Sequence, residues 1–169
     1  LQFLKSENLF FLDKIKIEEI INSNYLIEKY NIFKKFPSTI EFEIEKAEYL
    51  AFFKKKGIDY YLGSNGKFIE AKNNTINIPQ IFGTFEIQNF FNLKKSIDNS
   101  QFNYEDIKAL FYFPSGRWDI ETHSGILIKL SKEKTKDSLD LVFSILIDSK
   151  FKNIKIIDIR QKDQVVVNG

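Results

Sequence analysis

The sequence predicts an α+β protein in which two helices pack on a mixed, largely antiparallel β-sheet. Two segments, near residues 86–97 and 132–150, repeat apolar residues with the helical period of 3.6. Most other apolar residues alternate with polar ones in short runs bounded by turn residues, which is typical of half-buried strands. These segments follow one another without a regular strand–helix–strand rhythm, and this irregular order favours an α+β fold over a parallel α/β fold.

The first 48 residues predict a small unit of helices followed by strands. Residues 1–7 resemble the end of a helix, and residues 8–13 form an apolar cluster. Residues 15–23 predict a short helix, and residues 25–36 and 39–45 predict two strands separated by a proline turn. The second strand alternates isoleucine or phenylalanine with glutamate, so we expect one buried face and one wet face. The inward residues of the helix are expected to be Ile17, Ile20 and Ile21.

A set of short strands and one helix follows. Residues 49–54 and 58–62 predict strands, and Asn65-Gly66 is a strong signal for a tight turn, after which residues 67–69 pair back. Residues 71–79 are polar and end in a proline, which predicts a loop. The first amphipathic helix, over residues 86–97, is expected to bury Ile87, Phe90 and Phe91.

Residues 117–130, which follow a strand predicted over residues 107–113, predict the β-hairpin around which the sheet is organised. Ser124-Gly125 supplies the turn, because glycine adopts the positive φ that tight reversals need. On the first strand, Trp118, Ile120 and Thr122 share one face, and Asp119 and Glu121 share the other. Large aromatic residues are mostly buried, so we expect the single tryptophan to lie in the core. The alternative is an exposed tryptophan that recognises a partner.

The C-terminal part predicts a helix and two strands. The second amphipathic helix, over residues 132–150, carries a continuous apolar stripe, and Thr135 or Asp137 is expected to be its N-cap. Residues 153–160 alternate as a strand, and residues 164–167 form a last strand rich in β-branched valine.

Composition and motifs argue against several function classes. The net charge of +2 comes from 25 basic and 23 acidic residues that are evenly mixed, so no basic stripe suggests nucleic-acid binding. The seven glycines are scattered and form no phosphate loop, and the chain has no cysteine. The single histidine, His123, has no local acid–base partner beyond Glu121, and the glutamates of residues 41–45 spread along one strand face. No cofactor, metal or small-molecule substrate is therefore expected.

Five groups of residues, in order along the chain, carry a resemblance to a known family: 36–40, 60–62 with Gly66, 78–79 with Gly83, 117–120 with 125–130, and 157–160 with 163–167. Together they resemble the bacterial cell-division family FtsQ, called DivIB in Gram-positive bacteria, in an alphaproteobacterial-like form. Three positions depart from the family pattern: Phe36 replaces a tryptophan, Tyr49 stands where proline is common, and Gln161 replaces an aromatic residue found in some members. The last departure leaves partner contacts at that position open.

The resemblance implies two domains and a membrane anchor. Residues 1–48 would be a partial POTRA domain lacking its first strand, and residues 49–169 would be an FtsQ-type β domain. A transmembrane helix is expected upstream of Leu1, with the present segment in the periplasm at the division septum. The chain contains no methionine, so we expect Leu1 to begin a fragment or a processed product.

The resemblance also implies a non-enzymatic scaffold that recruits division proteins of the FtsB and FtsL type and other divisome members. In the family, the FtsB contact involves strand addition at the C-terminal edge of the β domain. Carried over to this sequence, the partner-binding residues would be Arg160, Gln164, Val165, Val166, Val167 and Asn168. The valine-rich last strand independently predicts a sheet edge, which is a template for another chain. The alternative is that this strand is paired inside the sheet.

Two other functions stay open at this point. POTRA-like modules also bind extended peptides in outer-membrane assembly and secretion systems. An enzyme of unrecognised fold is the third possibility.

Overall fold

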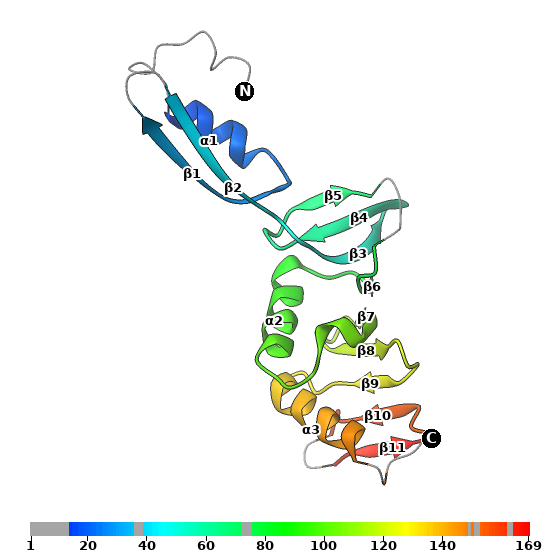
Figure 1. The fold of residues 1–169 in the computed structure, drawn as a ribbon. Helices are drawn as coiled ribbons and strands as arrows, with labels where there is room; N and C mark the ends of the chain where they lie inside the picture. The colour runs from blue at the N-terminus through cyan, green and yellow to red at the C-terminus, as the bar shows by residue number, and fades with distance from the viewer. Residues whose placement is uncertain (1–13, 36–38, 72–75, 149, 151–152, 162–163) are drawn as a thin grey trace. The chain divides into compact units, whose positions relative to one another are not determined.

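The computed structural model describes residues 14–35, 39–71, 76–148, 150, 153–161 and 164–169 (Figure 1). Three α-helices and eleven strands make up the described fold, which is α+β as the sequence predicts. In order, the elements are α1 (Lys14–Asn22), β1 (Ile27–Lys35), β2 (Thr39–Lys46), β3 (Tyr49–Lys55), β4 (Ile58–Gly63), β5 (Phe68–Glu70), β6 (Gln80–Phe82), α2 (Ile87–Asp98), a 3₁₀ helix (Tyr104–Asp106), β7 (Ile107–Tyr112), β8 (Trp118–Thr122), β9 (Leu127–Lys129), α3 (Thr135–Ile147), β10 (Ile156–Asp158) and β11 (Val166–Asn168).

The chain divides into two compact units that do not follow the chain order. The first unit extends to Leu50 and also takes in Tyr61–Glu70, whereas the second contains Ala51–Tyr60 and Ala71–Gly169. Strand β4 therefore gives its first three residues to the second unit and its last three to the first. Each unit is therefore made of two separate stretches of the sequence.

In the first unit, α1 packs against one face of a two-stranded antiparallel sheet made of β1 and β2. Ile17 and Ile21 are buried, whereas Ile20 is 39% exposed, so two of the three expected isoleucines face inward. The strand residues packed against the buried pair are Ile27, Tyr30, Ile32, Ile40 and Phe42.

The opposite face of β1 and β2 is mostly polar, as the alternation in the sequence predicts, although Phe33 lies on it and is 43% exposed. Lys29 lies 3.4 Å from Glu45 across the strands, and Lys35 pairs with Glu41. These cross-strand ion pairs are exposed and contribute little to the free energy of folding. They place charged groups in contact with solvent on this face. On the face toward α1, Ile44 is 49% exposed, so it is not buried as expected. The predicted helix and the two strands are confirmed to within two residues, whereas the predictions for residues 1–7 and 8–13 lie outside the described residues.

The larger sheet has the strand order β11-β10-β9-β8-β7-β6-β3-β4-β5. The pairs β10–β11, β8–β9 and β7–β8 are antiparallel. The turns between β3, β4 and β5 are too short for a parallel crossover, so these neighbours are antiparallel as well. Parallel pairing joins β9 to β10, β6 to β7, and β3 to β6. The sheet is therefore mixed and mostly antiparallel, as predicted.

Strand β6 was not expected from the sequence, which predicts only a loop up to Pro79. It consists of three residues held between β3 and β7 by parallel pairing, and a run this short carries no readable alternation. Gly83 follows it with a φ of +98°, and a Cβ atom there would collide with the carbonyl oxygen of Tyr112. Close approach of the backbone to β7 therefore requires glycine at this position.

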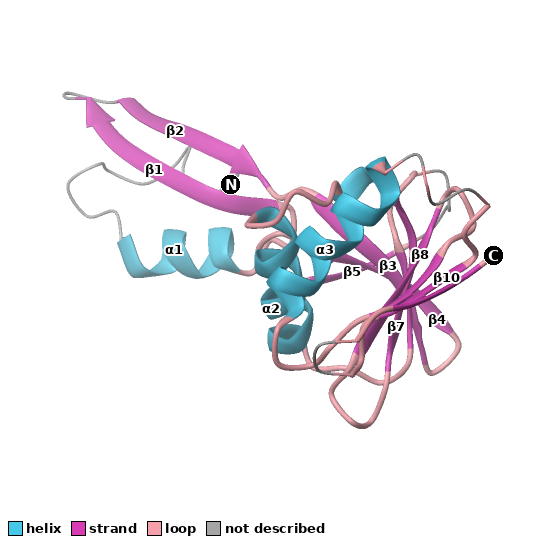
Figure 2. Cartoon of the chain, turned by 90° about the horizontal axis from the view of Figure 1, so that it is seen from below, coloured by secondary structure: helices cyan, strands magenta, loops and turns pink. Residues whose placement is uncertain are grey.

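Helices α2 and α3 contact each other and lie on the same face of the sheet (Figure 2). The fully buried side chains of this layer include Phe90 of α2 and Leu139 and Val142 of α3. Beneath them, the strands contribute the buried residues Leu110, Ile120, Ile128 and Ile157, and Leu130 directly after β9 is buried as well. The helices thus supply one apolar layer and every second strand residue supplies the other.

Trp118 lies in the core, as the sequence predicts, with only 7% of its surface exposed. Its ring centroid is 4.7 Å from that of Tyr112 and 6.0 Å from that of Phe85. The hairpin around it is confirmed, with β8 and β9 joined by a turn that contains Gly125 at a φ of +83°.

Helix α3 begins later and ends earlier than predicted. Its N-cap is Lys134, without a side-chain hydrogen bond, so the expectation of Thr135 or Asp137 as N-cap is wrong. Thr135 is already the first helical residue, and its hydroxyl donates back to the carbonyl oxygen of Ser131 at 3.2 Å. The predicted final strands are also shorter than expected, with β10 covering Ile156–Asp158 and β11 covering Val166–Asn168.

Replacing Trp118 by alanine should lower the free energy of unfolding by about 3–5 kcal/mol, because it removes a buried aromatic side chain and leaves a cavity. Chemical denaturation followed by circular dichroism measures this loss. The control Trp118→Phe keeps an aromatic ring in the cluster and should lose less. An alanine variant with an unchanged midpoint would contradict the core assignment.

Candidate functional site

Strand β11 lies at the end of the strand order of the large sheet, so one of its backbone edges has no neighbouring strand among the described residues. It pairs on its other side with β10, antiparallel, with Val167 opposite Ile157 and Val166 opposite Asp158. Of the residues expected to bind a partner, Val166, Val167 and Asn168 form this strand, and Gln164 and Val165 lead into it. Arg160 follows the end of β10.

The two faces of β11 differ in what surrounds them. Val167 pairs with the fully buried Ile157, on the face that the helices cover. Val166 points to the other face, beside Asp158, and is 61% exposed. A chain added along this edge would continue both environments, because side chains alternate along a strand.

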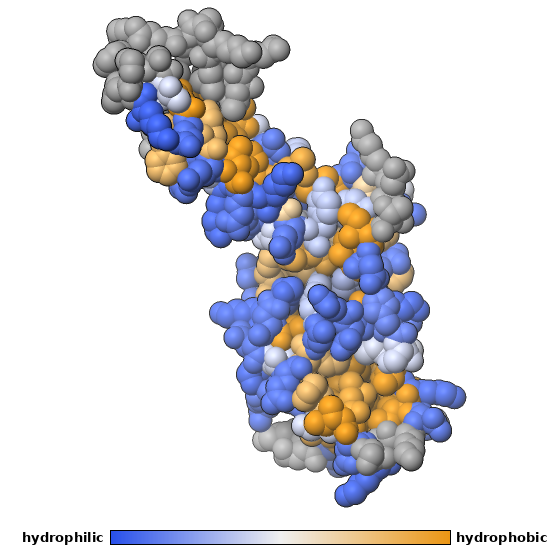
Figure 3. All heavy atoms as spheres, in the orientation of Figure 1, coloured by the Kyte–Doolittle hydropathy of each residue, from blue (hydrophilic) through white to orange (hydrophobic). Residues whose placement is uncertain are grey.

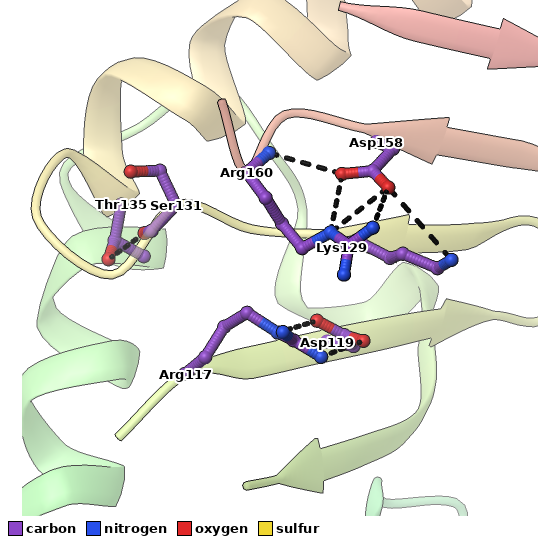
Figure 4. A network of polar contacts seen from close by, with 7 residues as sticks. All are labelled: Arg117, Asp119, Lys129, Ser131, Thr135, Asp158 and Arg160. Atoms are coloured by element: carbon purple, nitrogen blue, oxygen red, sulfur yellow. Dashed lines mark hydrogen bonds and ion pairs between the residues drawn. The ribbon is translucent and has the colours of Figure 1, made fainter. Parts of the chain in front are cut away.

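The face of the sheet opposite the helices carries a row of charges that crosses three strands (Figure 4). In the strand register, Asp119 of β8 lies opposite Lys129 of β9, and Lys129 lies opposite Asp158 of β10. This row, called the charged row below, ends beside Val166 of the edge strand. Opposite charges on neighbouring strands stabilise the sheet modestly, whereas like charges would repel.

Arg160 is held against Asp158 by several hydrogen bonds. Its Nε donates to Oδ1 at 2.8 Å and its Nη2 donates to Oδ2 at 2.6 Å, while Lys129 Nζ lies 3.9 Å from Oδ2. The bond from Arg160 holds the pKa of Asp158 below its ordinary value, although burial acts in the opposite direction. The same bond raises the pKa of Arg160, which stays charged.

A second pair of the same kind lies at the start of β8, with Arg117 directly before the strand. Arg117 Nε donates to Oδ1 of Asp119 at 2.9 Å, and the guanidinium carbon lies 4.3 Å from the ring centre of Phe113. Asp119 is only 3% exposed, whereas the sequence placed it on the polar face. Its burial raises its pKa, although the hydrogen bond and charge of Arg117 lower it.

A repeated pattern in the sequence could have revealed this site. Arg117 and Asp119, like Asp158 and Arg160, are two residues apart, which puts both members of each pair on the same face of a strand. Sequence reasoning selected Arg160 and missed Arg117, Asp119 and Asp158.

Two hollows border the edge strand. A cavity of about 390 Å³ on the charged face is lined by Arg117, Asp158, Arg160, Gln161, Gln164 and Val166. On the helix side, a groove of about 640 Å³ runs between the first half of α3 and the segment leading into β11, and Leu141 and Val165 are among its lining residues. Figure 3 shows apolar side chains at the surface over α3, where Leu141 and Ile147 are 40% and 68% exposed.

The other candidate sites gain no support from the geometry. His123 is exposed in the turn between β8 and β9, and its backbone N–H donates to the carbonyl oxygen of Asp106. Within the described ranges, no three His, Asp or Glu side chains gather as metal ligands. No helix in the described part of the chain has the length and apolar character needed to span a bilayer.

Comparison with known proteins identifies a matching family and several similar solved structures, one of which is described here. Residues 51–160 match the model of the family "Cell division protein FtsQ/DivIB, C-terminal". The major extracytoplasmic domain of the trans isomer of the cell-division protein DivIB from Geobacillus stearothermophilus aligns with 64% of this chain and 99% of its own, with 13% sequence identity and a TM-score of 0.45. No curated protein matches the sequence. The family match includes Arg160, and β11 follows its end.

The two carboxylates of the charged row should respond to pH with opposite signs. The folded pKa of Asp158 is lowered, so its stabilising effect is present above 3.8 and is lost as the pH falls through the folded value. Asp158→Asn should therefore lower the free energy of unfolding by up to about 1 kcal/mol at neutral pH. This deficit should disappear in acid.

Asp119→Asn serves as the matched contrast, because burial raises the folded pKa of Asp119. A raised carboxyl pKa stabilises the fold at low pH, and that contribution is lost as the pH rises through the folded value. Relative to the unmodified protein, Asp119→Asn should gain stability with rising pH, whereas Asp158→Asn should lose it. Thermal unfolding across the acid range measures both trends, and parallel trends would contradict the assigned shifts.

Proposed function

Because the chain belongs to the FtsQ/DivIB family of cell-division proteins, we propose that it is a divisome scaffold that recruits partners at the septum. The proposed partners are proteins of the FtsB and FtsL type, together with other divisome members. The proposed mode of binding is strand addition: a segment of the partner pairs with the outer edge of β11 and extends the sheet. In this proposal the protein organises other proteins and catalyses no reaction.

The observation that carries this proposal is the position of β11 at the end of the strand order. An edge strand presents backbone donors and acceptors that an extended segment of another protein can satisfy. Each backbone hydrogen bond contributes about 0.5–1.5 kcal/mol net, so a few of them give only a weak complex. Side chains near the edge must therefore supply the remaining affinity and the choice of partner.

Arg160 is the proposed side-chain contact, through a charge-assisted hydrogen bond to a partner carboxylate. Its bonds to Asp158 use Nε and Nη2, and a guanidinium group has five N–H donors, so donors remain on the same group. The guanidinium also lines the 390 Å³ cavity beside Val166. Asp158 would hold the guanidinium in place while a carboxylate of the added strand approaches from this cavity.

The proposed domain arrangement follows the family. Residues 1–48 would form a partial POTRA domain and residues 49–169 an FtsQ-type β domain, with a transmembrane helix before Leu1 and the present segment in the periplasm. The order of α1, β1 and β2 supports a POTRA-like unit. Sequencing the gene upstream of this segment tests the anchor, which should be an apolar stretch of about 20 residues after a short basic tail.

Proline substitutions along the edge should separate binding from folding. Backbone N–H groups alternate along β11 between pairing with β10 and facing outward, and proline removes one N–H. Among Val165→Pro, Val166→Pro and Val167→Pro, those that remove an inward N–H should lower the thermal midpoint. Those that remove an outward N–H should reduce co-purification with an FtsB-like coiled-coil segment and leave the midpoint nearly unchanged.

Ile76→Pro, at an exposed position outside the helices and strands, is a control for nonspecific effects of proline on partner binding. The proposal of strand addition at β11 is wrong if none of the three valine variants loses binding to the FtsB-like segment. It is equally wrong if binding falls only in variants that also lose stability.

The POTRA-like part should be the less protected part of the chain. No side chain of β1 or β2 is fully buried, whereas β8 buries four of its five residues. Local opening free energies follow such differences in packing. Hydrogen exchange followed by mass spectrometry should therefore show faster exchange in residues 1–48 than in residues 107–167. Stronger protection of residues 1–48 would contradict the proposal of an incomplete domain.

A further inference from the structure

The hairpin between β4 and β5 belongs to the first unit, although it lies inside the segment that matches the family model. Its tip, Ser64–Lys67, faces the turn that joins α1 to β1, residues 22–28. About forty residues separate the two segments in sequence. We propose that this tip is a clasp, whose side chains hold the α1–β1 turn and make the first unit depend on the hairpin.

Asn65 supplies the central contact of the clasp. Its side-chain amide nitrogen donates to the carbonyl oxygens of Tyr25 and Ile27, both at 3.0 Å. Its side-chain oxygen accepts from the backbone N–H of Lys67 at 3.0 Å, which closes the hairpin turn. The Asn65 side chain thus closes the hairpin turn through its oxygen and binds the α1–β1 turn through its nitrogen.

Lys67 holds the end of α1. Its ammonium group donates to the carbonyl oxygen of Asn22, the last residue of α1, at 2.6 Å and to that of Asn24 at 3.3 Å. The last carbonyls of a helix lack partners within the helix, and a cation there is favoured by the helix dipole. The last turn of α1 contains no basic residue of its own, so Lys67 supplies the missing cation.

Ser64 completes the clasp at its other end. Its hydroxyl donates to Oε2 of Glu28 at 2.7 Å and accepts from the backbone N–H of Glu48 at 2.9 Å. Its own N–H donates to the carbonyl oxygen of Glu48 at 2.8 Å. These bonds tie the start of β1 and the end of the β1–β2 ribbon to the same hairpin. Ser64, Asn65 and Lys67 therefore contact three different places in the first unit.

The clasp is a conformational device because β4 is one continuous strand used by both units. Opening the hairpin would release the α1–β1 turn, and loosening that turn would remove the partners of the hairpin side chains. Each event lowers the free energy required for the other, so the hairpin and the turn open as one cooperative unit. Many of these bonds are solvent-exposed, which places the clasp among the parts of the chain that open before the core.

Asn65→Asp is the sharpest test in the full chain. Aspartate keeps the oxygen that closes the turn, and Asp-Gly is as good a hairpin turn as Asn-Gly. It loses the two N–H donors and brings a negative charge toward the carbonyl oxygens of Tyr25 and Ile27. We expect amide exchange in residues 17–30 to become at least about tenfold faster, with residues 118–130 unchanged.

Lys67→Ala should produce the same local effect, and Lys67→Arg should restore protection because arginine also donates to two carbonyls. Lys46→Ala, at an exposed lysine of β2 in the same unit, is the matched control and should change nothing. Unchanged exchange in both Asn65→Asp and Lys67→Ala would overturn the clasp. So would faster exchange spread evenly over residues 17–30 and 118–130, because it would indicate global destabilisation.

Discussion

Burial of one face of the large sheet under α2 and α3 is the constraint on which the rest of the second unit depends. Every second residue of the central strands joins this core, which fixes the register of β7, β8, β9 and β10. A shift by one residue would expose Ile120, Ile128 and Ile157 and bury charges in their place. The same register fixes which residues lie on the opposite face, so the charged row is a consequence of how the core is packed.

On the opposite face, each carboxylate of the charged row is paired with an arginine two residues away in the sequence. Asp119 is nearly as buried as the core, and a buried carboxylate needs a partner, which Arg117 supplies from two residues earlier on the same face. Asp158 and Arg160 repeat this arrangement near the sheet edge, where the guanidinium is more exposed. The two pairs differ mainly in burial, and this difference gives their carboxyl groups opposite pKa shifts. The exposed pair contains Arg160, the residue that we propose contacts a partner.

The two compact units illustrate how a domain boundary can differ from a boundary in sequence. The family match begins at residue 51, where the second unit begins, yet residues 61–70 within that match belong to the first unit. Three side chains of the β4–β5 hairpin donate hydrogen bonds to residues 22–28 of the first unit. A chain cut between residues 48 and 49 would therefore separate α1 from the cation at its C-terminal end.

Local pattern in the sequence was enough to predict the fold class, the Trp118 hairpin, the first-unit helix and strands, and the valine-rich last strand, because each depends on periodicity or turn chemistry within a few residues. It did not predict β6, whose three residues become a strand only between β3 and β7. It did not predict the burial of Asp119 or the N-cap of α3 either. The order of the strands in the sheet, and the position of Lys129 between Asp119 and Asp158 on neighbouring strands, depend on pairing between segments far apart in the chain. Such pairing is decided by how the whole sheet packs, and only the tertiary structure contains it.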